Sequence, residues 1–295
     1  MCEVAVVTTG FFDGVHLGHR QVLETLVSSA RERGEEAIVV TFWPHPRTVL
    51  QQDARDFRLL TSLEEKRQLL LSTGVDRVEV LPFTRAFAAL TAREYLQLLQ
   101  ERFGASLVVM GYDNRIGRDR KTCGQLLEEG CSAAPRILLP DTNTPVSVSE
   151  EAVSSTRIRK ALEAGDVVSA HAMLGYRYGL YGVVVAGNRL GRTLGFPTAN
   201  MQLYEPLKLV PANGVYAVEV EVLGSTWKGM CNIGTRPTVG GTSRTIETHI
   251  LDFDEDIYGL PLQLRFLRRI RDERKFPSLD ALKWQLELDS ELCRR

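Results

Sequence analysis

The first half of this chain alternates between short apolar runs rich in β-branched residues and longer runs in which apolar residues recur at helical spacing. Strand–helix alternation of this kind is typical of a parallel sheet with helices on both faces, an α/β architecture of the Rossmann type. We expect five strands, at residues 4–9, 37–42, 78–81, 107–110 and 137–139.

Local signals place the ends of the intervening helices. Thr61-Ser-Leu-Glu64 and Thr91-Ala-Arg-Glu94 have the spacing of a capping box, in which two side chains satisfy free backbone N–H groups at a helix start. Gly34, Gly74 and Gly104 follow the last periodic residues, where glycine commonly ends a helix. We therefore expect helices to begin at both boxes and to end near these glycines.

The pattern changes from about Tyr178 onward. Short β-like runs separated by turns rich in Gly, Pro and Asn predict an antiparallel sheet or a small barrel. Ser278 can cap a final helix that carries Leu279, Leu282, Leu286 and Leu292. The change predicts two domains, residues 1–175 and 176–295. We expect strands in the second domain at residues 181–185, 215–222, 227–233, 245–251 and 262–268.

Composition narrows the class of protein. Hydrophobic residues make up 44% of the chain, and 36 basic residues nearly balance 37 acidic ones, so a nucleic-acid partner is not expected. No apolar run approaches the roughly 20 residues of a membrane span, and the first residues lack the basic segment of a signal peptide. We expect a cytoplasmic protein with reduced cysteines and no membrane or protein partner.

Two loops that bear glycines follow the first and fourth expected strands, at residues 8–19 and 111–117. For a strand order of 3-2-1-4-5, both lie where the order reverses, which is where open parallel sheets bind ligands. His16 and His19 flank Gly18 at the expected start of a helix, where free N–H groups favour an anion. Two imidazoles there could stabilise charge on a phosphorus centre. A turn with incidental histidines is the plain alternative, and zinc would lack further ligands.

A third phosphate-binding candidate is Val153-Ser-Ser-Thr-Arg-Ile-Arg159, although helix capping by its serines also explains it. Together with Phe12-Asp-Gly-Val-His-Leu-Gly-His19 and Gly111-Tyr-Asp113, it resembles the nucleotidyltransferases that carry HxGH and Ser-Thr-Arg motifs. More narrowly, residues 1–175 resemble the FMN adenylyltransferase half of the prokaryotic bifunctional riboflavin kinase/FAD synthetases. Phe11 and Ile116 depart from that family's usual residues.

The resemblance implies roles for the residues of these motifs. His16 and His19 would stabilise the transition state at the α-phosphorus of ATP as the phosphate of FMN attacks, pyrophosphate leaves and FAD forms. The segment Thr41-Phe-Trp-Pro-His-Pro-Arg47 matches one near the flavin, which implies flavin contacts for His45 and Arg47. ATP contacts are expected for Gly10, Gly18, Asp113, Ser155, Thr156 and Arg157.

The most informative run in the second half is residues 187–200, Gly-Asn-Arg-Leu-Gly-Arg-Thr-Leu-Gly-Phe-Pro-Thr-Ala-Asn. Gly187 and Gly191 allow a tight loop whose amides can face phosphate, and Thr198 and Asn200 offer the hard oxygen ligands that Mg²⁺ prefers. A simple Gly/Pro turn would explain the glycines alone. Farther along, Glu247 shares one face of an expected strand with His249.

The runs Gly195-Phe-Pro-Thr-Ala-Asn200, Asn232-Ile-Gly-Thr-Arg-Pro237, Ile246-Glu-Thr-His249 and Asp272-Glu-x-x-Phe276 resemble the flavokinase domain. That resemblance implies a six-stranded antiparallel β-barrel with a C-terminal helix. It also implies Mg²⁺-ATP binding by Thr198 and Asn200, and Glu247 as the general base that activates the ribityl 5′-hydroxyl of riboflavin. Arg271 and Glu273 are expected near the flavin.

The two resemblances cover nearly the whole chain and imply one bifunctional enzyme that makes FMN from riboflavin and then FAD from FMN, with ATP as co-substrate and Mg²⁺ as cofactor. Two other functions stay open at this point. A cytidylyltransferase would share the HxGH motif but would not need the second half. A flavin-binding sensor would not need His16, His19, Asn200 and Glu247 to be intact.

Overall fold

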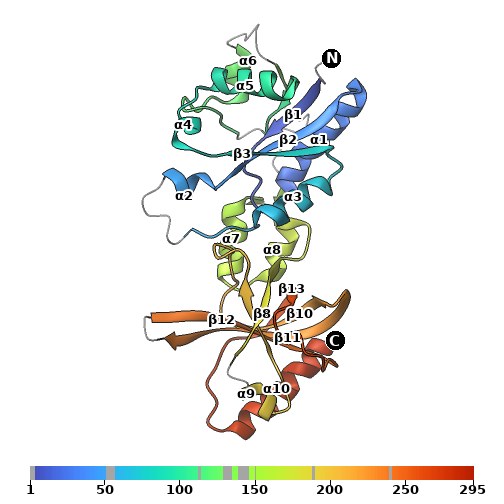
Figure 1. The fold of residues 1–295 in the computed structure, drawn as a ribbon, viewed down its shortest axis with the longest axis vertical. Coiled ribbons are helices and arrows are strands. Elements are labelled where there is room, and N and C mark those ends of the chain that lie inside the picture. Colours follow the sequence, from blue (N-terminus) through green and yellow to red (C-terminus); the bar gives the residue numbers. More distant parts are fainter. Residues whose placement is uncertain are drawn as a thin grey trace. The chain divides into compact units, whose positions relative to one another are not determined.

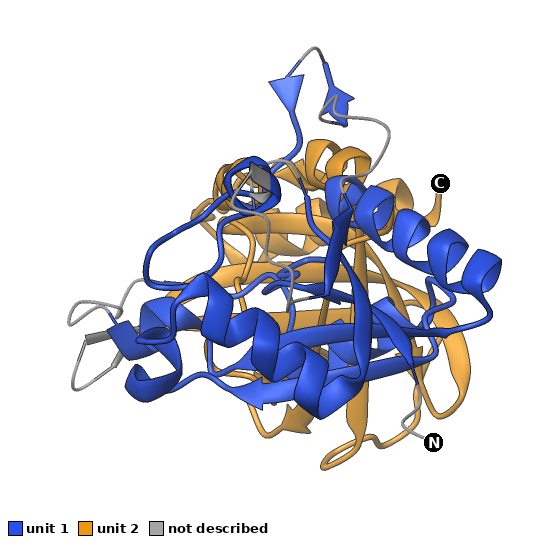
Figure 2. Cartoon of the chain, turned by 90° about the horizontal axis from the view of Figure 1, so that it is seen from above, with its two compact units in different colours: residues 1–155 blue, residues 156–295 orange. Residues whose placement is uncertain are grey.

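A computed structural model gives the fold in two compact units, residues 1–155 and 156–295 (Figures 1 and 2). Each unit is described by itself. The two units divide earlier in the chain than the expected boundary near residue 175. Within the described part of the chain, no helix combines the length and apolar character that a membrane crossing requires. The structure describes residues 4–50, 57–111, 114–128, 135–138, 146–149, 151–187, 190–238 and 241–295.

The first unit is built on a five-stranded parallel sheet, and its strand order is β3-β2-β1-β4-β5. This is the order assumed in the sequence analysis, so the reversal lies between the first and fourth strands. The five strands lie where the apolar runs predict them, although Leu139, the expected end of the last one, is outside the described residues. They are β1 (Ala5–Thr9), β2 (Glu36–Trp43), β3 (Arg77–Pro82), β4 (Ala105–Val109) and β5 (Arg136–Leu138).

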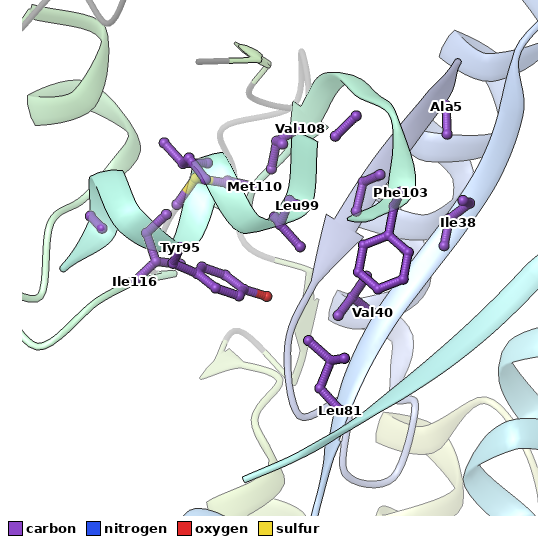
Figure 3. Close-up of a cluster of buried hydrophobic side chains, with 14 of the residues drawn as sticks. Ala5, Ile38, Val40, Leu81, Tyr95, Leu99, Phe103, Val108, Met110 and Ile116 are labelled. Atoms are coloured by element: carbon purple, nitrogen blue, oxygen red, sulfur yellow. The ribbon is translucent and has the colours of Figure 1, made fainter. Parts of the chain in front are cut away.

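Helices cover both faces of this sheet, as the alternation predicts. On one face α5 (Ala92–Phe103) buries Tyr95, Leu96, Leu99 and Phe103 against the strands (Figure 3). On the other, α1 (Leu17–Arg33) and α3 (Leu63–Leu71) complete a second apolar cluster. The unit also contains α2 (Pro46–Leu50), α4 (Arg85–Ala88), α6 (Cys123–Glu128) and the hairpin of β6 (Ser147–Val148) and β7 (Glu151–Ala152).

One expected helix cap is displaced by a residue. The box at Thr91 and Glu94 is confirmed, but α3 is capped by Ser62, whose hydroxyl accepts from the backbone N–H of Glu65 while the Glu65 carboxylate accepts from that of Ser62. Thr61 does not cap the helix because its hydroxyl is bound to Asp13 and to the backbone N–H of Gly14. The sequence rule found the helix start but could not foresee this competing partner.

The second unit begins in α7 (Ser155–Glu163), continues through α8 (Val167–Leu174) and then forms a closed six-stranded barrel. The barrel order is β10-β11-β12-β9-β8-β13, and every neighbouring pair is antiparallel. Its strands are β8 (Gly179–Val185), β9 (Ala199–Leu203), β10 (Gly214–Val222), β11 (Ser225–Thr238), β12 (Gly241–Ile250) and β13 (Pro261–Arg271).

Periodicity alone predicts five of the six barrel strands. The sixth, β9, consists of the last two residues of the 187–200 run and the three that follow, so the run that was expected to form a loop leads directly into the barrel wall. A short α9 (Leu190–Thr193) lies within the same run. The chain ends in α10 (Leu279–Arg294), which Ser278 caps as expected by accepting a hydrogen bond from the backbone N–H of Ala281.

Candidate functional site

In the first unit, the histidine pair lies at the N-terminus of α1. His16 is the N-cap residue, and its Nδ1 accepts a 3.3 Å hydrogen bond from the backbone N–H of His19. The two imidazole rings are stacked, with centroids 3.6 Å apart and planes inclined by 15°. A Cβ on Gly18 would lie 3.3 Å from the His16 ring, so glycine keeps room for this stack. The sequence therefore presents two imidazoles together at a helix end that favours anions.

The electrostatics of the pair favour a neutral His19 ring. Burial holds the pKa of His19 well below its usual value, and the neighbouring His16 and the Lys66 ammonium lower it further. His16 Nδ1 acts as an acceptor, so a neutral His16 carries its proton on Nε2. The covered Nδ1 atom of His19 has no hydrogen-bond partner among the described residues. His19 is thus suited to act as a hydrogen-bonding group rather than as a fixed positive charge.

A buried lysine supports the loop that precedes the histidines. Lys66 is 5% exposed, and its Nζ donates to the backbone oxygens of Phe11 and Phe42 at 3.2 and 3.3 Å. Burial lowers the pKa of Lys66 to about 8, against the opposing attraction of the Asp13 carboxylate, so the amine is largely protonated at pH 7. The sequence analysis missed this residue because Lys66 lies in an ordinary helical run, and only the tertiary fold buries it.

Asp13 anchors the same loop from the other side. Its carboxylate accepts from the backbone N–H groups of Leu60 and Thr61 and from the Thr61 hydroxyl, at 3.0 to 3.1 Å. The backbone oxygen of Asp13 in turn accepts a 3.0 Å hydrogen bond from the hydroxyl of Ser155. The first part of the Ser-Thr-Arg motif is therefore in contact with the loop that leads to His16. Thr156 and Arg157 follow in the first turn of α7, across the unit boundary.

The two expected loops meet at the carboxyl ends of β1 and β4. Asn114 donates a 2.9 Å hydrogen bond to the backbone oxygen of Thr9, which ties the 111–117 loop to the end of β1. Both loops line a cavity of about 510 Å³, and Gly10 lies on its wall. Asp113 lies outside the described residues. Convergence at the point where the strand order reverses is what the sequence predicts.

Five aromatic side chains line this cavity, which the sequence analysis did not foresee. Its wall includes the two residues that depart from the family pattern, Phe11 and Ile116, so both remain in apolar packing. The aromatic residues lie on different elements and only converge in the fold, so no local motif signals them. They are Phe11, Phe42, Phe83, Phe87 and Tyr95, and Arg115, Arg118 and Arg120 add basic groups.

His45 and Arg47 lie beside this cavity rather than on its described lining. The His45 ring packs 5.1 Å from that of Phe11 and 4.4 Å from that of Phe57, centroid to centroid. The guanidinium of Arg47 lies over the Phe57 ring at 5.3 Å. Between the two residues, Pro46 contributes directly to the wall. The segment thus reaches the cavity through Pro46 and through the contact of the His45 ring with Phe11.

In the second unit, the register of the barrel puts three polar side chains in one row. Glu247 on β12 pairs with Asn232 on β11 and with Asn200 on β9. Residues paired across antiparallel strands project from the same face of the sheet, so the three side chains lie next to one another. Asn232 belongs to a motif that the sequence analysis singled out without giving it a role. The fold places it directly beside the expected general base.

Gly187 and Gly191 of the glycine loop lie close to the expected magnesium ligands Asn200 and Thr198. A Cβ on Gly187 would lie 2.2 Å from Nδ2 of Asn200, and a Cβ on Gly191 would lie 3.5 Å from Cγ2 of Thr198. Thr198 and Asn200 supply neutral oxygen donors, and the described residues contain no cluster of three or more His, Cys, Asp or Glu that could hold a metal. This donor set fits Mg²⁺ that is bound largely through nucleotide phosphates and waters.

Two cavities of about 300 Å³ adjoin this loop and share Thr198. One of them is lined by Glu247, Asn232, His249 and the arm of residues 271–276, which includes Arg271 and Glu273. The other is bordered by residues 253–258. His249 shares the lining with Glu247, as their spacing on one strand predicts, and its Nδ1 lies 2.8 Å from the backbone oxygen of Pro197. Thr198 therefore lies beside the expected base Glu247 and the expected flavin-side residues Arg271 and Glu273. The other expected metal ligand, Asn200, is paired with Glu247.

Comparisons with known proteins place both halves in one family. The family model for FAD synthetase matches residues 2–157, and the model for riboflavin kinase matches residues 174–295. A bifunctional riboflavin kinase/FMN adenylyltransferase of Escherichia coli K12 is 40% identical over 99% of this chain and 92% of its own length. The chain belongs to the family of bifunctional riboflavin kinase/FMN adenylyltransferases.

Other relatives agree with this membership. The Bacillus subtilis bifunctional riboflavin kinase/FMN adenylyltransferase is 35% identical over 97% of this chain and 90% of its own length. A crystal structure from Streptococcus pneumoniae, described as that of a macrolide-efflux protein, superposes with a TM-score of 0.91 at 35% identity, and it covers 100% of this chain and 95% of the other. The family is one of transferases in flavin cofactor biosynthesis, and its members act on small molecules.

Proposed function

We propose that residues 176–295 phosphorylate riboflavin to FMN with ATP, and that residues 1–175 then transfer the adenylyl group of ATP to FMN, giving FAD and pyrophosphate. The observation that carries this proposal is that each matched half has its own cavity. Glu247 lines the cavity of the second half, and the cavity of the first half is lined by Gly10 and Gly117 of the two loops, although His16 and His19 are not among its lining residues. A cytidylyltransferase would not need the barrel, and a sensor would not need the row of Asn200, Glu247 and Asn232.

For adenylyl transfer, a phosphate oxygen of FMN attacks the α-phosphorus of ATP and pyrophosphate leaves. His16 and His19 donate hydrogen bonds to the oxygens on which charge develops, and the N-terminus of α1 adds its free N–H groups. Ser155, Thr156, Arg157 and the glycines of the two loops hold the triphosphate. The aromatic cavity takes the isoalloxazine ring, because planar apolar rings pack well against aromatic side chains.

For riboflavin phosphorylation, Glu247 accepts the proton of the ribityl 5′-hydroxyl as that oxygen attacks the γ-phosphorus and ADP leaves. A positioned base of this kind contributes roughly 10²- to 10⁴-fold. Thr198 and Asn200 would hold Mg²⁺, which neutralises charge on the phosphates when it is bound. Gly187 and Gly191 keep the loop close to these two side chains. Asn232 orients the substrate beside Glu247.

The proposal is tested by incubating the protein with riboflavin, ATP and Mg²⁺ and separating the flavins by chromatography over time. We expect FMN to appear first and then to be converted to FAD, with pyrophosphate released in step with FAD. If the reaction stops at FMN, the assignment of residues 1–175 as an FMN adenylyltransferase is wrong. CTP consumption without ATP-dependent flavin turnover would instead favour a cytidylyltransferase.

A further inference from the structure

The buried face of the C-terminal helix α10 carries polar side chains, although leucines would be expected there. The buried residues of α10 are Gln285, Asp289 and Cys293, which are spaced four apart and so lie on one face. Asp289 is 0% exposed, whereas Leu279 is 58% exposed. Burying a carboxylate is costly unless it is paired and hydrogen-bonded. Helix packing alone therefore does not explain why Asp289 is buried.

Asp289 is the centre of a connected network. Its Oδ2 accepts a 2.9 Å hydrogen bond from Nε of Arg271 and lies 2.8 Å from Nη2 of the same guanidinium. Its Oδ1 accepts a 2.7 Å hydrogen bond from Nε2 of Gln285. The Oε1 atom of Gln285 then accepts from Arg274. One carboxylate thus orients Arg271 directly and Arg274 through a single intervening amide.

Both arginines belong to the wall of the Glu247 cavity, as do Glu273 and Phe276. Their guanidinium groups lie 5.6 and 4.9 Å from the centroid of the Phe276 ring, which adds a cation–π contact to each. Within this arm, Glu273 approaches β11 so closely that a Cβ on Gly234 would lie 2.4 Å from its Oε1. The arm 271–276 therefore contacts the barrel through Glu273 and α10 through Arg271 and Arg274 on either side of it.

We propose that Asp289 is a positioning residue for riboflavin phosphorylation, which fixes Arg271 and, through Gln285, Arg274 on the cavity wall that faces the flavin. The proposal rests on the assignment of this cavity to the kinase reaction. It changes the expected role of Arg271, because Nε and Nη2 are engaged by Asp289 and Nη1 donates to the backbone oxygen of Asp272. Arg271 therefore forms part of the wall of the Glu247 cavity, and α10 supports the kinase site through Asp289 and Gln285.

The first experiment compares Asp289→Asn with Glu287→Gln, which alters an exposed carboxylate on the same helix. We expect Asp289→Asn to raise the KM for riboflavin on the order of tenfold to a hundredfold, because small displacements of positioning groups have effects of this size. The KM for ATP should change little, because Arg271 and Arg274 line only the Glu247 cavity of the two that share Thr198. Glu287→Gln should match the wild type.

The adenylyltransferase activity of the same molecules provides an internal control. FAD formation from supplied FMN should be unchanged in Asp289→Asn, which separates lost positioning from general unfolding. An unchanged riboflavin KM in a protein that still makes FMN would overturn the role of Asp289 alone. A wild-type protein that forms no FMN at all would instead overturn the kinase assignment on which the proposal rests.

The double variant Arg271→Met/Asp289→Leu covers the case in which Asp289→Asn does not fold. Replacing both partners leaves no uncompensated buried charge, so the helix should still pack. We expect its riboflavin KM to be raised as in Asp289→Asn, with FAD formation from FMN retained. A wild-type riboflavin KM in this double variant would contradict the proposal.

Discussion

His16 and His19 show how one residue's environment sets its chemistry. Their rings are stacked 3.6 Å apart at the start of α1, and burial keeps the pKa of His19 low. A neutral imidazole can donate one hydrogen bond, and in the proposed reaction His19 would donate it to a phosphate oxygen on which charge develops. The sequence predicts the pair and its place at a helix start, but it cannot predict burial or stacking.

The lowered pKa of His19 makes stability depend on pH in a defined direction. In the unfolded chain the imidazole titrates near 6.5, whereas in the native state it takes a proton only at lower pH. Below about pH 6.5 the unfolded state therefore binds more protons, and the free energy of unfolding falls. In His19→Gln this part of the acid dependence should be absent, while above about pH 7.5 its slope should match the wild type.

Tryptophan fluorescence can follow this effect in the first unit, because Trp43 lies on β2 while Trp227 and Trp284 lie in the second unit. Urea denaturation would be measured in a Trp227→Phe/Trp284→Phe background between pH 5 and 8. His171 has its own lowered pKa, of about 4, but it lies in the second unit and is present in both proteins compared. Equal acid dependence with and without His19 would refute the buried neutral imidazole.

At the scale of elements, the adjacent hydroxyls of Thr61 and Ser62 at the start of α3 have different structural roles. Ser62 caps α3, whereas Thr61 fixes Asp13 and so shapes the loop that leads to the histidines. A capping-box rule applied to the sequence assigned the cap to Thr61, because both positions fit the spacing of a Ser or Thr followed by a glutamate. Only the contact with Asp13, 48 residues earlier in the chain, distinguishes them.

These two residues make a matched pair of variants. Ser62→Ala should lower the free energy of unfolding by about 1 kcal/mol, as the loss of an N-cap typically does, and leave FAD formation intact. Thr61→Val keeps the shape but removes the hydroxyl's hydrogen bonds with Asp13 and Gly14, so it should lower the rate of FAD formation from FMN. Chemical denaturation and a flavin assay on both variants measure the difference. Equal rates of FAD formation would contradict the role of Thr61.

At the scale of the whole molecule, the helices and strands are predicted well from the sequence. The cavities and buried polar groups that they form together are predicted less well. Strand–helix alternation predicted the parallel sheet, and β-rich runs predicted an antiparallel sheet or a small barrel. The strand order was assumed rather than derived, and the six-stranded barrel was implied by the family resemblance. The aromatic cavity, the buried Lys66 and the inward-facing Asp289 were missed, because each depends on residues brought together from distant parts of the chain. Motifs indicated the residues that we propose to handle phosphate, since those cluster in loops at helix and strand ends.

The central claim is that one chain carries two separable active sites, and reciprocal variants test it most directly. Glu247→Ala should lower FMN formation from riboflavin by at least about 10²-fold, while FAD formation from supplied FMN survives. His19→Ala should lower FAD formation by a similar factor, on the order of 10², while FMN formation survives. Chromatography of the flavins from both folded variants measures this. If either change abolishes both activities in a folded protein, the account of two independent sites is wrong.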